Sequence, residues 1–249
     1  VYTVLLTVTT NFSCTATAVA TETVFCLPSV TAPPSFSICP GTAVASAQTT
    51  FTTTCAAPAY GTPAAIVFVN NPNPTTNTTS THGGIPLADT TDLNSIPNYN
   101  AINPNTSCGL LVDTIYGYAV TVVGNNIGCI GNFQTFTISV YPTPTVAVTS
   151  NATVCANAMI PAVNFTGCPS AGETFSWTTS GDNVGLSSPG SGNIASFPGQ
   201  NTTDIPAVAE VDVTPWANGC SGPPSTFSIT VNPIPTMTVT SPAPYCPSD

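Results

Sequence analysis

The sequence predicts an all-β chain built from tandem β-sandwiches, and three observations support this prediction. Apolar and polar residues alternate in short runs such as "TFTISV" (135–140), which is typical of strands with one buried face. Proline and glycine interrupt these runs at short intervals, and no stretch shows the period of an amphipathic helix. Blocks of sequence also recur at fixed spacings, which indicates several domains of one immunoglobulin-like type.

The first recurring block runs from a proline to a cysteine. It occurs three times, as "PSVTAPPSFSIC" (28–39), "PTVAVTSNATVC" (144–155) and "PTMTVTSPAPYC" (235–246). In a second block, Gly-Cys-x-Gly is followed by an alternating strand. Its cysteine precedes the next proline block by the same distance in both copies, from Cys129 to Pro144 and from Cys220 to Pro235. We expect Gly-Cys-x-Gly to form a turn in each copy.

A further strand is expected before each of these turns, in which Val120 and Val122 correspond to Val211 and Val213. These elements define two sandwich domains, at residues 28–143 and 144–234. Residues 1–27 are expected to be the closing strands of a preceding repeat or a donor strand, and residues 235–249 the start of a following repeat. The chain is therefore a window onto a longer array, or a subunit that completes itself with a neighbour.

The first domain is longer than the second by about 25 residues, counted between equivalent cysteines. The polar tract from about residue 70 to 105 contains this excess, and we expect it to be a long decorated loop between two strands.

Composition excludes several classes of partner. The 249 residues include no lysine or arginine and ten aspartates and glutamates, for a formal net charge of -10. Such a chain cannot neutralise a phosphate backbone or an anionic membrane surface, so nucleic acid is excluded as a direct partner. The longest apolar runs, such as "AAIVFV" (64–69), are too short to insert across a membrane.

Ten cysteines without a Cys-x-x-Cys metal pair indicate disulfides and an oxidising, extracellular location. The repeated cysteines flank the same strands in both copies, which predicts the pairs Cys39–Cys129 and Cys155–Cys220. Cys55 and Cys108 bracket the inserted tract and are expected to pin its base. The other four have no assigned partner: Cys14, Cys26, Cys168 and Cys246. A free buried thiol is the alternative for Cys168, and Cys246 is expected to need a partner in a neighbouring unit or subunit.

The second domain carries a resemblance to a known family. Its "VCANAMIPAVNFTGC" start, "FSW" strand, "GSGNI" turn, "NGC" turn and "PIPT" linker (154–236) resemble the PKD-like repeats of giant secreted surface proteins and adhesins of Bacteroidota. In the first domain, Phe68 takes the place of Trp177. The resemblance implies tandem immunoglobulin-like sandwiches, export to the bacterial cell surface, and a role in adhesion or surface filaments.

We predict no catalytic residue, no cofactor and no metal site, because each candidate has a simpler interpretation. His82, with Asp89 and Asp92 nearby, lies in the polar tract and is expected to be a solvated loop residue. Glu210 and Asp212 share one strand face, as expected of a solvent-facing edge. Asp182 is expected to be a turn aspartate rather than a calcium ligand.

The two tryptophans are expected to differ in role. Trp177 stands where a sandwich keeps its core aromatic residue. Trp216, beside Pro215 in a predicted turn, stays available for a contact such as stacking on sugar.

Attached sugar is expected at two kinds of motif. Asn-x-Ser/Thr triplets give the candidates Asn11, Asn77, Asn105, Asn151, Asn164 and Asn201. The resemblance to Bacteroidota surface proteins implies O-glycans at Asp-Thr-Thr and Asp-Thr-apolar motifs, which makes Thr90 and Thr114 candidate acceptors.

The sequence therefore predicts a non-enzymatic structural unit of an extracellular filament or adhesin stalk, with itself as partner. Because lysine is absent, sheet edges lack the charge that most often blocks pairing with another chain. The first strand is the candidate subunit contact, through Tyr2, Val4, Leu6 and Val8, together with Cys246. The alternative is a carbohydrate- or protein-binding adhesin module whose inserted loop recognises surface glycans or host and abiotic surfaces, and which would lose its ligand when that loop is deleted.

Overall fold

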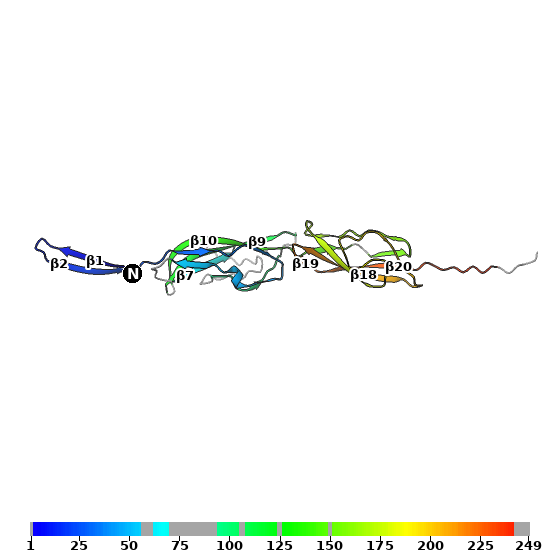
Figure 1. Ribbon diagram of the computed structural model, residues 1–249, viewed down its shortest axis with the longest axis horizontal. Coiled ribbons are helices and arrows are strands. Elements are labelled where there is room, and N and C mark those ends of the chain that lie inside the picture. Colours follow the sequence, from blue (N-terminus) through cyan, green and yellow to red (C-terminus); the bar gives the residue numbers. More distant parts are fainter. Residues whose placement is uncertain are drawn as a thin grey trace, which may run out of the picture. The chain divides into compact units, whose positions relative to one another are not determined.

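The computed structural model describes residues 2–55, 62–69, 94–104, 108–123, 126–148 and 151–241 (Figure 1). Regular structure in this part of the chain is almost entirely β, and its one helical element is the short 3-10 helix η1 (Ser46–Thr49). The chain divides into two compact units, Val1–Pro142 and Thr143–Asp249, which we describe separately.

The described residues of unit 1 form ten strands. They are β1 (Tyr2–Thr9), β2 (Thr15–Glu22), β3 (Pro28–Thr31), β4 (Phe36–Ile38), β5 (Ala43–Val44), β6 (Thr52–Cys55), β7 (Thr62–Val69), β8 (Tyr99–Asn100), β9 (Leu111–Val123) and β10 (Asn126–Val140).

In unit 2, ten further strands lie within residues 145–232, of which the structure describes all but 149 and 150. They are β11 (Thr145–Ala147), β12 (Ala152–Cys155), β13 (Met159–Ile160), β14 (Thr166–Cys168), β15 (Thr174–Gly181), β16 (Gly190–Ser191), β17 (Phe197–Pro198), β18 (Ala207–Ala217), β19 (Cys220–Ser221) and β20 (Ser225–Asn232).

Unit 2 is a β-sandwich of two layers. Its larger sheet has the order β12-β20-β18-β15-β16, in which β12 runs parallel to β20 and the other pairs are antiparallel. The second layer contains the pairs β11–β14 and β13–β17 and an isolated bridge between Val163 and Ile194. The β13–β17 pairs and this bridge follow one register, so they form a single interrupted ladder. The alternating burial of β18 directs Val211 and Val213 into the core between the layers.

Unit 1 repeats this topology. Its larger sheet has the order β4-β10-β9-β7, with β4 parallel to β10, and β3–β6 and β5–β8 form the second layer. Phe36 lies opposite Ile138 in unit 1, and Ala152 lies opposite Ile229 in unit 2. The distance in sequence from Phe36 to Ala152 equals that from Pro28 to Pro144, and the distance from Ile138 to Ile229 equals that from Cys129 to Cys220. Both units are therefore immunoglobulin-like sandwiches with the same strand pairing.

The predicted correspondence of the strand before the turn is wrong by five residues. Phe136 pairs with Ile115, and its equivalent Phe227 pairs with Val211, so Ile115 rather than Val120 corresponds to Val211. The β9–β10 hairpin is longer because β10 contains two irregular steps, between Ile127 and Ile130 and between Ile130 and Phe133, where pairing shifts. Val120 and Val122 repeat the alternating valines Val211 and Val213, whereas the true equivalents are Ile115 and Gly117, so the apolar pattern alone favoured the wrong alignment.

Sheet register also corrects the predicted match between Phe68 and Trp177. Trp177 pairs with Val213, whose equivalent in unit 1 is Gly117, and Gly117 pairs with Val67. Phe68 pairs with Tyr116, so it stands one position away, where the strand alternation reverses the face.

The first predicted Gly-Cys-x-Gly turn (128–131) lies within β10, whereas in the second copy Asn218 and Gly219 form the turn between β18 and β19. In both copies the second glycine of the motif permits a close backbone approach. A Cβ atom at Gly131 would meet the carbonyl oxygen of Pro28, and one at the equivalent Gly222 would meet that of Pro144. The motif thus seats the first strand of each sandwich against its last hairpin.

The polar tract at residues 70–105 is only partly a loop. Residues 94–104 belong to the sandwich, since Ile96 and Ala101 are fully buried and Tyr99–Asn100 forms β8. A two-residue strand shows no alternation, which is why the sequence did not reveal it. The rest of the tract, including His82, Asp89 and Asp92, lies outside the described residues.

Three predicted disulfide pairs are wrong. Cys26 bonds Cys55, with 5.8 Å between the Cα atoms, across the ends of β3 and β6, so Cys55 does not pair with Cys108. Cys129 and Cys155 are free thiols, which excludes the pairs with Cys39 and Cys220. Four cysteines take part in other disulfides: Cys39, Cys108, Cys168 and Cys220, so Cys168 is not a free thiol.

The parallel pairing of β12 with β20 explains the error. Cys155 lies opposite Asn232 at the end of β20, whereas Cys220 precedes the start of that strand. A strand rises roughly 3.3 Å per residue, so the length of β20 alone keeps these cysteines on the order of 20 Å apart. A disulfide joins Cα atoms less than about 7 Å apart. The same geometry separates Cys39, next to Ile38 and its partner Val140, from Cys129.

Candidate interaction surfaces

The β1–β2 hairpin exposes an apolar face along its whole length. Antiparallel pairing places Tyr2, Val4, Leu6 and Val8 on one face with Ala16, Ala18, Ala20 and Glu22 opposite them. The other face is rich in threonine, with Leu5 opposite Val19. Every residue of both strands is exposed, including Val4 at 53% and Leu6 at 62%. The four predicted contact residues therefore form one continuous surface.

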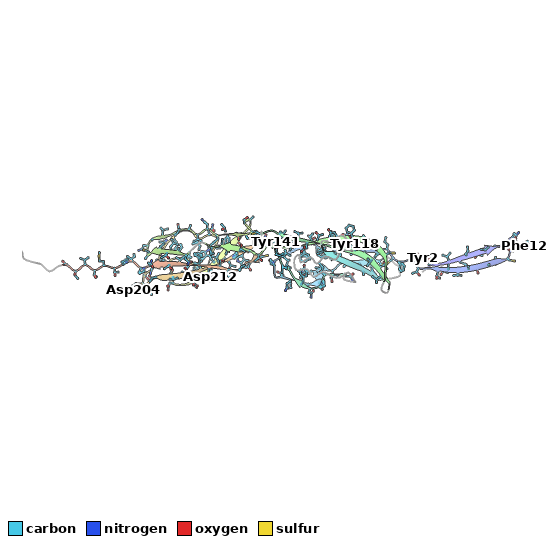
Figure 2. The ribbon with its side chains drawn as sticks, turned by 180° about the vertical axis from the view of Figure 1, so that it is seen from behind. Tyr2, Phe12, Tyr118, Tyr141, Asp204 and Asp212 are labelled. Carbon is cyan, nitrogen blue, oxygen red and sulfur yellow. A yellow bond between two sulfur atoms is a disulfide. The ribbon has the colours of Figure 1, made fainter. Side chains whose placement is uncertain are left out.

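The turn of this hairpin adds to its exposed apolar area. Phe12 is 84% exposed at the turn, and Tyr2 lies at the opposite end of the hairpin (Figure 2). Isolated exposed apolar residues are common on proteins, but a contiguous row of them marks an interaction surface.

A second exposed apolar segment follows β20. Residues 233–241 form no strand, and Ile234, Met237 and Val239 project with exposures of 54%, 86% and 81%. Cys246, the other predicted contact residue, lies outside the described residues.

Asp182, Glu210 and Asp212 are surface carboxylates of unit 2, and two of them have structural partners. Glu210 and Asp212 lie on the outer face of β18, but this strand is central in its sheet rather than at an edge. The Asp212 carboxylate accepts a hydrogen bond of 2.6 Å from the Thr226 hydroxyl, and it lies at the surface of the unit (Figure 2). Asp182 accepts a hydrogen bond from the Val208 backbone N–H, which confirms its structural role at the end of β15.

The tryptophans divide as core and surface residues. Trp177 is buried in the core of unit 2 and donates its indole N–H to the carbonyl of Gly192, as predicted for a core aromatic residue. Trp216 lies in β18 rather than in a turn. It is 42% exposed, and its indole N–H donates to the Ser176 hydroxyl.

A shallow pocket of about 530 Å³ opens beside Glu173 in unit 2. Phe165, Gly167, Phe175 and Asn193 contribute to its wall, and Glu173 is the one titratable side chain among the residues that line it. One carboxylate oxygen of Glu173 is buried without a hydrogen-bond partner, and burial raises the pKa of this carboxyl above its ordinary value. A lone carboxylate lacks the second acid or base that hydrolysis of a sugar requires.

In the described part of the chain, no three histidine, cysteine, aspartate or glutamate side chains are grouped to hold a metal ion. Within the same residues, no helix is both long and apolar enough to cross a membrane.

The glycan candidates differ in accessibility. Asn11, Asn151 and Asn164 are exposed, and the side-chain oxygen of Asn151 accepts a hydrogen bond from the Ser228 backbone. Thr114 is half-buried in β9 between Asp113 and Ile115, which are fully buried. Three candidates lie outside the described residues: Asn77, Thr90 and Asn105.

The amide group of the glycan candidate Asn201 has a structural role. Its side-chain nitrogen donates to the carbonyls of Ile205 and Val231, both at 2.7 Å. A glycan would replace one of these N–H donors. In unit 1, Asn103 makes the equivalent bonds to the carbonyls of Gly109 and Val140. In both sandwiches the amide thus connects the residues before the start of one strand, β9 or β18, to the end of the neighbouring strand, β10 or β20.

No protein-family model matches the chain, and no curated protein matches its sequence significantly. Similar solved structures include mouse cadherin-23 EC22-24, with a TM-score of 0.42 and 10% identity, covering 84% of this chain and 67% of that one. The fibronectin(III)-like modules of Clostridium thermocellum CbhA give 0.30 and 13%, covering 86% and 100%. The Ig1-2 module of the Drosophila receptor protein tyrosine phosphatase DLAR gives 0.28 and 10%, covering 83% and 99%. Identities of 10–13% with TM-scores below 0.5 give no information on the activity or partners of this chain. The fold assignment rests on the sheets and cores described above.

Proposed function

We propose that the chain is a non-enzymatic structural repeat unit of an extracellular bacterial surface filament or adhesin stalk. The observation that carries this proposal is the repetition of one sandwich, with matching strand register, in two successive units. Tandem units of one kind build extended structures because each can make the same contact with the next.

The side chains of the described residues support a structural role over a catalytic one. Asp182 and Asp212 accept hydrogen bonds from a backbone N–H and a hydroxyl group, and the pocket beside Glu173 contains one titratable group. Disulfides such as Cys26–Cys55 suit a protein that works outside the cell. Exposed asparagines, among them Asn11 and Asn164, remain candidates for attached sugar.

Electron microscopy of the native material tests this function. We expect filaments or rods with an axial repeat that matches one or two sandwiches. The central strands β9, with 13 residues, and β18, with 11 residues, correspond to lengths of roughly 35–45 Å per unit. The proposal would be contradicted by isolated particles without any regular repeat, together with protection of the protein from a protease added to intact cells.

A further inference from the structure

The proline-to-cysteine block has the same structural task in both sandwiches. Its first part forms β3 or β11 and covers the core, and its second part, β4 or β12, joins the larger sheet in parallel beside the last strand. In unit 1, Val30 of this block is 3% exposed, and its backbone N–H and carbonyl both bond the Asn132 side chain of β10. Each block is thereby paired with one closing hairpin, β9–β10 or β18–β20.

The β1–β2 hairpin corresponds to these closing hairpins. Glu22 precedes Pro28 by the same number of residues as Ile138 precedes Pro144 and Ile229 precedes Pro235. In this alignment Val4 corresponds to Ile115 and Val211, which are both fully buried, whereas Val4 is 53% exposed. The apolar face of the hairpin is therefore the core-facing side of a sandwich hairpin that lacks its cover among the described residues.

The third copy of the block lacks a hairpin in the same way. Met237 corresponds to Val30, yet it is 86% exposed, and Val239 is exposed beside it. Among the described residues, β2 pairs with β1 alone, and residues 235–241 pair with no strand. In the part of the chain that the structure describes, the apolar face of the β1–β2 hairpin is thus uncovered, and residues 235–241 cover no core.

Charge does not oppose the association of these two segments. Residues 235–246 contain no charged side chain, and Glu22 is the one carboxylate of residues 1–22. Although the chain has a net charge of -10, bringing an uncharged segment to this hairpin adds little repulsion.

We propose that residues 235–241 of one copy of the chain cover the apolar face of the β1–β2 hairpin of a second copy. The register of both sandwiches assigns the contacts: Met237 lies over Val8, and Val239 lies over Leu6. Because the contact joins opposite ends of two copies, each copy keeps one free hairpin or block, and the association continues as an open polymer.

One position limits the contact. Gly131 and Gly222 admit the proline carbonyl of their own block, but the hairpin has Thr15 at the equivalent position. The Cβ atom of Thr15 excludes the same approach by Pro235, so the contact begins at Met237.

The inference rests on the proposed function, and full-length chains with single substitutions test it. We expect wild-type protein to self-associate with rising concentration in sedimentation velocity. Leu6→Asp and Met237→Asp each remove one half of the contact and should weaken self-association at least tenfold. Leu5→Asp is the matched control, because Leu5 is as exposed as Leu6, at 61% against 62%, but lies on the opposite face.

Mixing the two defective variants gives the decisive result. Leu6→Asp chains keep an intact block and Met237→Asp chains keep an intact hairpin, so an equimolar mixture should form dimers and no larger species. A monomeric wild type at the highest soluble concentration would overturn the inference. So would equal defects in Leu5→Asp and Leu6→Asp, or a mixture without dimers.

Microscopy of the same variants separates this inference from the proposed function. Filaments that persist in Leu6→Asp and Met237→Asp would show that the units polymerise through another contact, which leaves the structural function intact. Dimers of the predicted kind in solution, without any filament from native material, would refute the filament and leave the contact standing.

Discussion

A pair of phenylalanines occupies the same position in both sandwiches. Phe51 lies 5.5 Å from Phe136 between ring centroids, and the equivalent Phe165 lies 6.3 Å from Phe227. Around this pair the units differ, because unit 2 has Val213 where unit 1 has Gly117. A Cβ atom at Gly117 would clash with the Phe51 ring. The two cores therefore fill the same space with different side chains on one backbone plan.

Hydroxyl groups in the core of unit 1 predict opposite effects of two conservative substitutions. The buried Thr49 hydroxyl bonds the carbonyls of Ser46 and Ile96 and accepts the Ile96 backbone N–H. Thr49→Val leaves these backbone groups unpaired and should lower the free energy of unfolding by about 1–3 kcal/mol. The buried Tyr99 hydroxyl has no hydrogen-bond partner, so Tyr99→Phe should leave stability unchanged or higher.

Urea denaturation of both variants measures this difference. An equal loss of stability in Thr49→Val and Tyr99→Phe would contradict it. Burial and, to a smaller extent, the charge of Asp113 raise the pKa of Tyr99, so its hydroxyl stays protonated over the whole working range of pH.

The environment of Glu173 predicts that the stability of unit 2 depends on pH. Because burial raises the pKa of this carboxyl in the folded chain, the folded state binds the proton more tightly than the unfolded state does. The contribution of Glu173 to stability is therefore largest at low pH and falls as pH rises through the ordinary glutamate pKa and up to the raised one. Glu173→Gln should raise Tm at pH 7 and leave it nearly unchanged at pH 3.5.

Thermal unfolding at these two pH values tests the prediction, with Glu210→Gln as the control for the lost charge. Glu210 lies on the outer face of β18. A Glu173→Gln variant that is less stable at pH 7 than at pH 3.5, relative to wild type, would show that the ionised carboxylate has a favourable partner.

At the scale of elements, the sequence predicts what depends on local pattern and misses what depends on register. The strand alternation of "TFTISV" and the block spacings predicted the closing strands and the repeat correctly. The predicted alignment of β9 was wrong because the irregular pairing inside β10 cannot be recognised in an apolar sequence. The cysteine pairs failed for a related reason: the parallel direction of β4 and β12 is a tertiary property.

The candidate surface shows the same division. Alternation in residues 1–10 placed Tyr2, Val4, Leu6 and Val8 on one face correctly. The roles of Asn201 and of Gly131 could not be predicted, because both depend on backbone groups from strands far apart in the sequence.

Disulfide connectivity gives a prediction for these elements. Replacing Cys26 and Cys55 together by alanine should lower the stability of unit 1 by about 3–4 kcal/mol, the chain-entropy value for a closed loop of this size, with a sequence separation of 29. Cys129→Ser and Cys155→Ser should have little effect, because both residues are free thiols. Alkylation of the unreduced native protein followed by mass spectrometry should label the exposed Cys14 and Cys155. Full protection of Cys155 after unfolding without reductant would contradict the connectivity.

At the scale of the whole molecule, the charge of the chain sets how it responds to salt. Ten carboxylates and no lysine or arginine leave repulsion among acidic groups without compensating cations. Added salt screens this repulsion over a Debye length of about 10 Å at 0.1 M. Screening should stabilise the folded units and strengthen association between copies, since both bring like charges closer together.

Tm should therefore rise by about a few degrees between 10 and 500 mM NaCl and then level off, and self-association should tighten over the same range. A variant with Asp204→Asn and Glu210→Gln, which removes two exposed charges, should show a smaller rise because it starts with less repulsion. This comparison separates screening from a general effect of salt on apolar surfaces, which would act equally on both proteins. A Tm that falls with NaCl in the wild type would instead mean that favourable charge pairs outweigh the repulsion, against a composition that has no lysine or arginine to form them.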